Sequence, residues 1–178
     1  MIEVPSRDEA LKLLHKVGCP QQVLEHVSFV SEVALQIASK CESNGVTVNR
    51  RLVEVGALLH DIGRSRTHEI SHAVVGAQLA RENGMPEDLI RIVENHVGAG
   101  IPRSEALRLG LPPKDYLQTT PEEKIVAYAD KITKGHRRMS FEDAINELAN
   151  TLGPTHPSIE RLRRLHEEIA KMMGSDYL

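Results

Sequence analysis

The most constraining feature of this sequence is a histidine–aspartate pair at the end of an apolar helix face. Leu58 and Leu59 continue the face of a predicted helix, and His60 and Asp61 stand where that face should go on. Burying such groups is costly unless they are paired or bound to a cation. Gly63 follows, and it allows the backbone to turn sharply. The pair therefore predicts a helix that ends inside the protein and holds a cation at its end.

The rest of the chain also carries the start and stop signals of helices. Capping boxes (Ser6 with Glu9, and Thr120 with Glu123), capping residues (Asn49, Ser71 and Ser140) or prolines open the predicted helices, and glycines follow many of them. The expected helices span about 7–17, 20–44, 50–59, 72–83, 86–97, 121–135, 141–150 and 157–173, with a short one at 103–109. We find no alternating β-branched run long enough for a strand. The predicted fold class is an all-α, single-domain helical bundle.

The length of 178 residues suits one domain with a single sizeable core. We expect an N-terminal helix in residues 1–19, a main domain in 20–138, and helices in 139–178 that pack on the same domain. A boundary near residue 138 is the alternative. The stretch 99–120 is broken by three prolines, and long connections of this kind are often functional. It is therefore a candidate lid or substrate wall.

Charge and composition give no strong signal for nucleic acid or for a membrane as a partner. The net charge of −3 provides no general attraction to nucleic acid or to an anionic membrane. Aromatic residues make up only 3% of the chain, too few for a stacking platform for single strands. No apolar run approaches the roughly 18 residues of a membrane span. The polar N-terminus and the widely spaced Cys19 and Cys41 predict a cytoplasmic protein.

Four more polar residues lie on or beside apolar helix faces: His26, His72, His96 and Asp130. Taken singly, His26 reads as a boundary histidine, and Asp130 reads as the partner of Lys134 at i+4. Taken with the histidine–aspartate pair, they form a set of four imidazoles and two carboxylates. Such a set suits iron, manganese, zinc, cobalt or nickel better than magnesium or calcium.

These residues carry a resemblance to a known family. His26, His60-Asp61 and Asp130 resemble the H…HD…D signature of the HD-domain metal-dependent phosphohydrolases, and HDIG at 60–63 resembles one of its variants. The match covers roughly residues 20 to 140, which makes 20–138 the HD domain. His72 in SHAVVGAQLA and His96 in IVENHVGAG resemble two further histidines of the dinuclear members. With EEKIVAYADKI, they make the bacterial diadenosine tetraphosphate hydrolases the nearest in appearance.

The resemblance implies a metal centre and roles for its ligands. One ion would be held by His26, His60, Asp61 and Asp130, and a second by Asp61, His72 and His96. The last three would also be the catalytic groups, unless the two histidines serve the substrate phosphate instead. The implied cofactor is one or two divalent transition metal ions, with iron first and manganese, zinc, cobalt or nickel as alternatives.

Two cations near these ligands are expected to bind substrate. Arg64 stands where the family often has a lysine, and it can clamp a phosphate through two hydrogen bonds. Lys131 follows the final aspartate and begins a cluster of cations that reaches residue 138. This cluster either attracts phosphates or simply follows a helix C-terminus.

The implied function is hydrolysis of a phosphoester or anhydride in a nucleotide or another small phosphorylated compound, through hydroxide generated at the metal. Two alternatives stay open: a non-catalytic HD module that senses nucleotide, and a diiron oxygenase of HD type. The final helix carries apolar residues at helical spacing, which predicts core packing, with a homodimer contact as the alternative.

Overall fold

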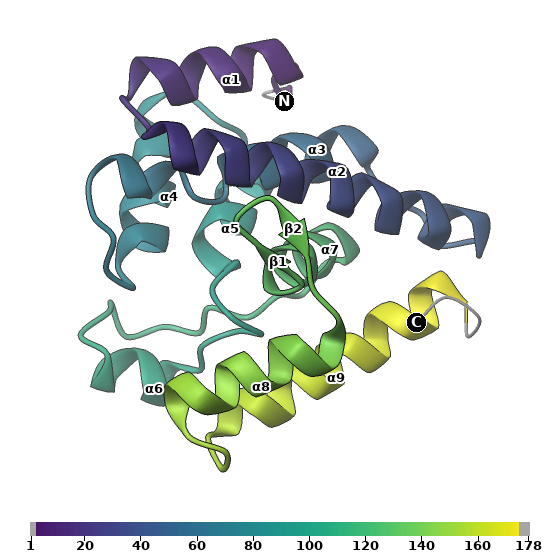
Figure 1. The fold of residues 1–178 in the computed structure, drawn as a ribbon. Coiled ribbons are helices and arrows are strands. Elements are labelled where there is room, and N and C mark those ends of the chain that lie inside the picture. Colours follow the sequence, from purple (N-terminus) through teal and green to yellow (C-terminus); the bar gives the residue numbers. More distant parts are fainter. Residues whose placement is uncertain (1–2, 175–178) are drawn as a thin grey trace.

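Helix α2 (Gln21–Ser43) lies at the centre of the fold in the computed structural model, which describes residues 3–174 (Figure 1). Helices α1 (Arg7–Lys16), α3 (Arg50–Leu59) and α7 (Pro121–Lys131) form a layer with it: α3 and α7 pack on α2, and α1 packs on α3. The apolar face of α2 is buried along its length because its valines, alanines and isoleucine recur at helical spacing. This layer contains most of the main core.

A second group of elements packs against α3. The short 3-10 helix η1 (Ile62–Ser65) leads to α4 (His72–Glu82), which packs on both η1 and α5 (Glu87–Asn95). Helix α5 in turn contacts α3 and α7. This arrangement brings the end of α3, the beginning of α4 and the end of α5 to one place.

The remaining helices lie on the side of the molecule away from α1 (Figure 1). Helix α6 (Arg103–Arg108) sits within the irregular stretch, and α8 (Phe141–Leu152) and α9 (Pro157–Met173) pack against each other. Strands β1 (Thr133–Lys134) and β2 (Arg137–Arg138) form an antiparallel hairpin between α7 and α8. Five apolar residues of α9 are buried in the main core: Ile159, Leu162, Leu165, Ile169 and Met173. The dimer contact considered for this helix stays a prediction.

The predicted all-α class is confirmed, and most helix boundaries agree with their sequence signals. The capping box of Ser6 and Glu9 forms as expected, and Asn49 and Ser140 cap α3 and α8. Ser71 was expected to cap α4, but its backbone is already helical and its side chain caps nothing.

One predicted helix is too long, and the hairpin that replaces its end was missed. Helix α7 ends at Lys131 rather than near residue 135. Gly135 adopts a positive φ of 63°, which turns the chain back and pairs Thr133 with Arg138. Strands of two residues leave no periodic pattern in a sequence, so the hairpin had no signal to reveal it. Among residues 3–174, no helix combines the length and apolar character needed to cross a bilayer.

Candidate metal centre

The six predicted ligands meet where several helices begin or end. His60 closes α3 and Asp61 follows it; His72 is the first residue of α4, and His96 closes α5. His26 and Asp130 come from α2 and α7, which cross the same region. His60, Asp61, His72 and His96 are buried, each with 4% or less of its surface exposed. Separate helix ends thus deliver a polar cluster into the core.

All four histidines are oriented in the same way. In His60, His72 and His96 the Nδ1 atom lies 2.7–2.8 Å from the carbonyl oxygen three residues earlier. In His26 the Nδ1 atom lies 2.9 Å from the carbonyl oxygen of Gly135, in the turn of the hairpin. Because a carbonyl only accepts, each Nδ1 carries a hydrogen, and the neutral ring turns an Nε2 lone pair toward the cluster. This is the orientation found in histidines that bind metals.

The inner ends of these rings contact other acceptors. The Nε2 atoms of His72 and His96 lie 3.1 Å apart, and they are 3.1 and 3.5 Å from the Oδ1 atom of Asp61. A neutral ring that donates from Nδ1 has no hydrogen left for these contacts. A cation must therefore sit among the three side chains, either as protons on the rings or as a metal ion.

A second group repeats this chemistry beside the first. The Oδ1 atom of Asp130 lies 3.0 Å from the Nε2 atom of His26 and 3.5 Å from that of His60. His60 Nε2 is also 3.7 Å from the Oδ2 atom of Asp61. Two groups can hold an ion with donor atoms within 4.8 Å of one another: His26, His60 and Asp61, and Asp61, His72 and His96. Asp61 belongs to both and offers a different oxygen to each.

Two buried atoms of the cluster have no hydrogen-bond partner within the described part of the chain: the Nε2 atom of His60 and the Oδ1 atom of Asp61. Buried polar atoms are nearly always satisfied, so orphaned atoms of this kind indicate a missing partner. Both face the centre of the cluster, and both are good donors to a divalent transition metal. The residues present therefore fit the metal that the sequence implies.

Protons and a metal ion would compete for these donors. Burial opposes the charged form of His60, but the negative charges of Asp61 and Asp130 outweigh it and raise the pKa of the ring. Burial lowers the pKa of His96 to about 4, so its Nε2 lone pair is available at neutral pH. Burial also disfavours ionised Asp130, yet the positive charge of Lys131 holds its pKa well below the ordinary value.

Gly63 allows the loop after the histidine–aspartate pair to lie against α4. A Cβ atom at this position would lie 1.9 Å from the carbonyl oxygen of His72 and 2.7 Å from the amide nitrogen of Gly76. Both are backbone atoms, which cannot move aside as a flexible side chain would. Glycine is therefore required for η1 and the beginning of α4 to come together, and with them Asp61 and His72.

The two predicted substrate-binding cations are each paired with one carboxylate. Arg64 donates from Nε to the Oδ2 atom of Asp61 at 2.8 Å, and the Nζ atom of Lys131 lies 3.2 Å from the Oδ2 atom of Asp130. Both side chains remain about 30% exposed. His68, in the polar loop between η1 and α4, is exposed. Lys134, considered as a partner of Asp130, instead pairs with Glu147.

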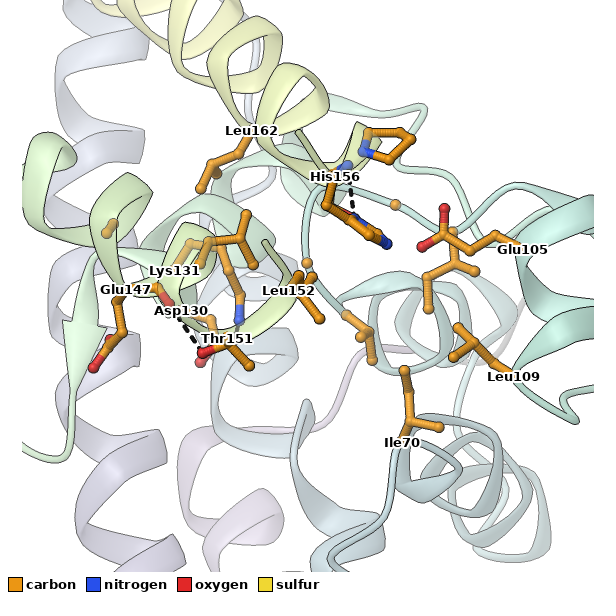
Figure 2. Close-up of a pocket in the computed structure, with 18 of the residues that line it drawn as sticks. Ile70, Glu105, Leu109, Asp130, Lys131, Glu147, Thr151, Leu152, His156 and Leu162 are labelled. Atoms are coloured by element: carbon orange, nitrogen blue, oxygen red, sulfur yellow. Dashed lines mark hydrogen bonds and ion pairs between the residues drawn. The ribbon is translucent and has the colours of Figure 1, made fainter. Parts of the chain in front are cut away.

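A cavity of about 730 Å³ opens beside the cluster, and Asp130 and Lys131 form part of its wall (Figure 2). One side comes from the predicted wall segment, including Ile101 and Leu109. The opposite side comes from residues 139–162 of α8, α9 and their connection. The sequence assigned these last helices to core packing, with a homodimer contact as the alternative for the final one. A role in a cavity was missed, because leucines at helical spacing look the same whether they face a core or a cavity.

Comparison with known proteins gives a family and a set of relatives. A family model described as HD domain matches residues 23–135. A protein of Methanocaldococcus jannaschii, described as uncharacterized, is 48% identical over 166 residues, which cover 93% of this chain and 98% of that protein. A tRNA (cytidine(56)-2'-O)-methyltransferase of Picrophilus torridus is 39% identical over 97% of this chain, but the match covers 49% of the methyltransferase.

A more distant relative and a solved structure complete the comparison. Ribonuclease Y of Thermotoga maritima is 34% identical over 142 residues, 77% of this chain and 24% of the ribonuclease. This chain thus spans about half of the methyltransferase and a quarter of the ribonuclease. The phosphodiesterase PgpH HD domain of L. monocytogenes, solved in complex with cyclic-di-AMP, covers 94% of this chain with a TM-score of 0.54 and 20% identity. That likeness supports the fold.

Proposed function

The chain belongs to the HD-domain family, and we propose that it is a metal-dependent phosphohydrolase that cleaves a nucleotide or a similar small phosphorylated compound. One observation carries the proposal. The Nε2 atoms of His72 and His96 meet 3.1 Å apart beside Asp61 while their Nδ1 atoms are committed to backbone carbonyls. Such a contact is favourable only around a cation. A bound divalent metal would supply positive charge that polarises a phosphoryl group and lowers the pKa of a water.

The ligand roles follow from the two groups of donors. His26, His60, Asp61 and Asp130 would hold one ion, and Asp61 with His72 and His96 would hold the second. Asp61 is the natural bridge because its two oxygens face different groups. The backbone carbonyls behind the histidines fix the rings so that their lone pairs stay directed at the ions.

The protein's own cations would orient the phosphate. Arg64 donates from Nε to Asp61 and from Nη1 to the carbonyl oxygen of His68 at 3.4 Å, so its Nη2 atom is the nitrogen that would bind phosphate oxygens. Lys131 reaches the same place from the cavity side, where its Nζ atom balances Asp130. Neutralising the phosphoryl oxygens from both sides favours attack on phosphorus, because the charge on the phosphoryl group is shielded from the nucleophile.

The proposal is tested by metal content and activity in the same preparation. The chain, purified without chelators and without oxygen, is expected to hold one to two transition metal ions and to hydrolyse bis(4-nitrophenyl) phosphate. His72→Ala is expected to lower both, whereas His68→Ala, an exposed histidine nearby, changes neither. Full turnover without oxygen also separates a hydrolase from an oxygenase. Bound metal without hydrolysis of any phosphoester would leave a nucleotide-sensing module.

Assays with a panel of phosphorylated compounds would identify the class of substrate. We place the diadenosine tetraphosphate type first, because the contexts of the ligand histidines resemble those of its hydrolases. Cyclic phosphodiesters come second, and nucleoside monophosphates third. Two bound ions favour the first two classes, and one ion favours the last.

The second candidate function is hydrolysis of a phosphodiester bond within RNA. It is supported by the names of two relatives, a ribonuclease and a tRNA-modifying enzyme, and by the exposed cations Lys134, His136, Arg137 and Arg138 on the β1–β2 hairpin. These cations lie next to the cavity wall. If RNA is the substrate, the double variant Arg137→Glu with Arg138→Glu lowers cleavage of an oligonucleotide much more than cleavage of a dinucleotide.

A further inference from the structure

We propose that the cavity beside the metal centre is a base pocket, in which Glu105 and His156 recognise the edge of a purine that carries an exocyclic amino group. The inference rests on the proposed function, since it assumes that the phosphate of the same ligand lies at the metal centre. It adds the part of the substrate that the centre does not contact, and the residues that select it.

The position and size of the cavity suit the organic part of a nucleotide. It begins at Asp130 and Lys131, and it extends between the α6 segment and the α8–α9 pair. Its volume of about 730 Å³ lies within the range of ligand-binding pockets. A phosphate held by the cations at one end therefore leaves the rest of its molecule in this space.

The walls offer flat, apolar surfaces rather than aromatic rings to stack on. Aliphatic side chains line both sides, among them Ile70 and Leu109 on one side and Leu148 and Leu152 on the other. Leu109 and Leu152 are large apolar residues left 41% and 44% exposed. A planar base held between the two sides would cover such surface, which is otherwise costly to leave in contact with water.

Two polar groups converge in the far part of the cavity. Figure 2 shows the imidazole of His156, the N-cap of α9, and the carboxylate of Glu105, from α6, pointing toward one another. The Nδ1 atom of His156 accepts the amide hydrogen of Ser158 at 3.2 Å, as the cap of α9. An accepting Nδ1 leaves the hydrogen of the ring on Nε2. His156 is therefore a donor toward the cavity.

Glu105 is held in place as an acceptor. Its Oε2 atom accepts a hydrogen bond of 2.7 Å from Arg161, and the side chains of this pair are only 13% and 18% exposed. Arg161 is itself fixed by the hydroxyl of Ser158, the residue whose amide orients His156. The bond to Arg161 uses one oxygen of the carboxylate, and the other lone pairs are available to a ligand in the cavity that Glu105 lines.

A donor and an acceptor side by side match a ligand edge that carries an acceptor next to a donor. Adenine has this pattern, with its N6 amino group beside a ring nitrogen, and guanine offers its N2 amino group. The amino group would donate to Glu105, and a neighbouring acceptor would receive the hydrogen of His156. A base that lacks the amino group leaves the buried carboxylate of Glu105 without a donor, and such a base therefore binds more weakly.

The test compares ligands that differ only in the base, titrated calorimetrically into the full chain with added Mn²⁺. AMP or GMP is expected to bind about 10- to 100-fold more tightly than purine riboside 5′-monophosphate, which has no amino group, and than ribose 5-phosphate. Equal affinities for the four compounds would overturn the proposal.

Two substitutions assign the preference to the named residues. Glu105→Gln turns one acceptor oxygen into a donor while keeping the bond to Arg161, and His156→Ser keeps a residue that caps helices well but removes the Nε2 donor. Each is expected to remove most of the amino-group preference. Glu160→Gln, an exposed glutamate on α9, is the matched control and leaves it unchanged. If the preference for the amino group survives both substitutions, Glu105 and His156 do not recognise the base, and the proposal is wrong.

Hydrolysis of bis(4-nitrophenyl) phosphate, which has no base, separates this proposal from the previous one. If the chain cleaves that diester but shows no base preference, the base pocket is wrong and the hydrolase assignment stands. If it cleaves nothing yet binds aminopurine nucleotides through Glu105, the pocket stands and the hydrolase assignment fails.

Discussion

The metal-centre side of the molecule and the α8–α9 side of the cavity next to it are built on opposite principles. The metal-centre side consists of carboxylates and of histidines buried at helix ends, and backbone carbonyls fix the histidine rings. The α8–α9 side consists of aliphatic side chains, and some of them remain exposed. On the first side each group needs the others, because a buried charge is costly alone. On the second side a single side chain can change with little effect on its neighbours, so this side is suited to determine which substrate is bound.

Substitution of Asp61 is expected to have the largest effect, because its two oxygens serve both donor groups. Asp61→Ala should reduce bound metal to a small fraction and lower kcat/KM for a phosphodiester by at least about 10³-fold. Metal analysis and kinetics on protein with an unchanged circular dichroism spectrum measure this. Intact activity in the folded variant would remove the metal centre from the mechanism.

Gly63→Ala tests whether the polar side depends on backbone contact. The added Cβ atom meets backbone atoms of α4, so we expect a loss of about 3–5 kcal/mol in the free energy of unfolding, together with weaker metal binding. Gly18→Ala is the comparison, because Gly18 has a φ of 79° but nothing near it, and it should cost only about 1 kcal/mol. Urea unfolding gives both values. Equal costs would mean that α4 can move away from η1.

Tyr128→Phe tests the contact between α7, which carries Asp130 of the metal-centre side, and the α8–α9 side. The hydroxyl of Tyr128 on α7 bonds to the Nδ1 atom of His166 on α9 at 2.6 Å, and the ring of His166 stacks on Phe141 of α8. Its loss should cost about 1 kcal/mol in the free energy of unfolding. Tyr116→Phe removes a similar bond, to the carbonyl of Pro112 within the same segment rather than to α9. Only the Tyr128 variant should speed hydrogen exchange in α9.

The contact that His166 makes with Tyr128 also predicts that the free energy of unfolding depends on pH. Burial lowers the pKa of His166, so below the ordinary histidine pKa the unfolded chain binds more protons than the folded one. Stability contributed by His166 is therefore present above that pKa and decreases as the pH falls toward the lowered value. Urea midpoints measured at pH 7.5 and 5.5 should differ less in His166→Gln than in the unchanged protein. An equal difference would show that His166 does not contribute.

Leu152→Ser is expected to have the smallest effect on stability, less than about 0.5 kcal/mol, because Leu152 is already 44% exposed. It should raise the KM for a nucleotide a few-fold, since one apolar wall of the pocket is lost. Leu162→Ala, on the same cavity but buried in the core, should cost about 2–5 kcal/mol instead. A large destabilisation by Leu152→Ser would mean that the apolar side is as interdependent as the polar one.

The difference between the two sides also explains what the sequence could predict. Polar residues on apolar helix faces are rare enough to be noticed, and they led to His26, His60, Asp61, His72, His96 and Asp130. Their proximity is seen in the structure, and their role as ligands stays a prediction. Helix caps could also be predicted from the sequence, because the side chains of Ser6, Asn49 and Ser140 accept hydrogen bonds from backbone amides only three residues away.

Other features depend on contacts distant in sequence. Nothing local indicates that Glu105 meets Arg161, or that the cap of α9 is also a donor toward the cavity. The hairpin after α7 was missed because two-residue strands have no periodicity. Arg64 was expected to bind phosphate, and the structure adds a bond to Asp61 that only the path of η1 could reveal.

The backbone carbonyls behind the four histidines have a consequence for selectivity. Because each ring is already fixed, an arriving ion loses little of its binding free energy to the ordering of side chains. The spacing of the donors is set by helix ends embedded in the main core, which do not adjust to the size of the ion. An ion that prefers longer bonds or a different coordination geometry would have to move α3 or α5. In the proposed metal centre, the rigidity of the scaffold would therefore select among metals before any substrate is bound.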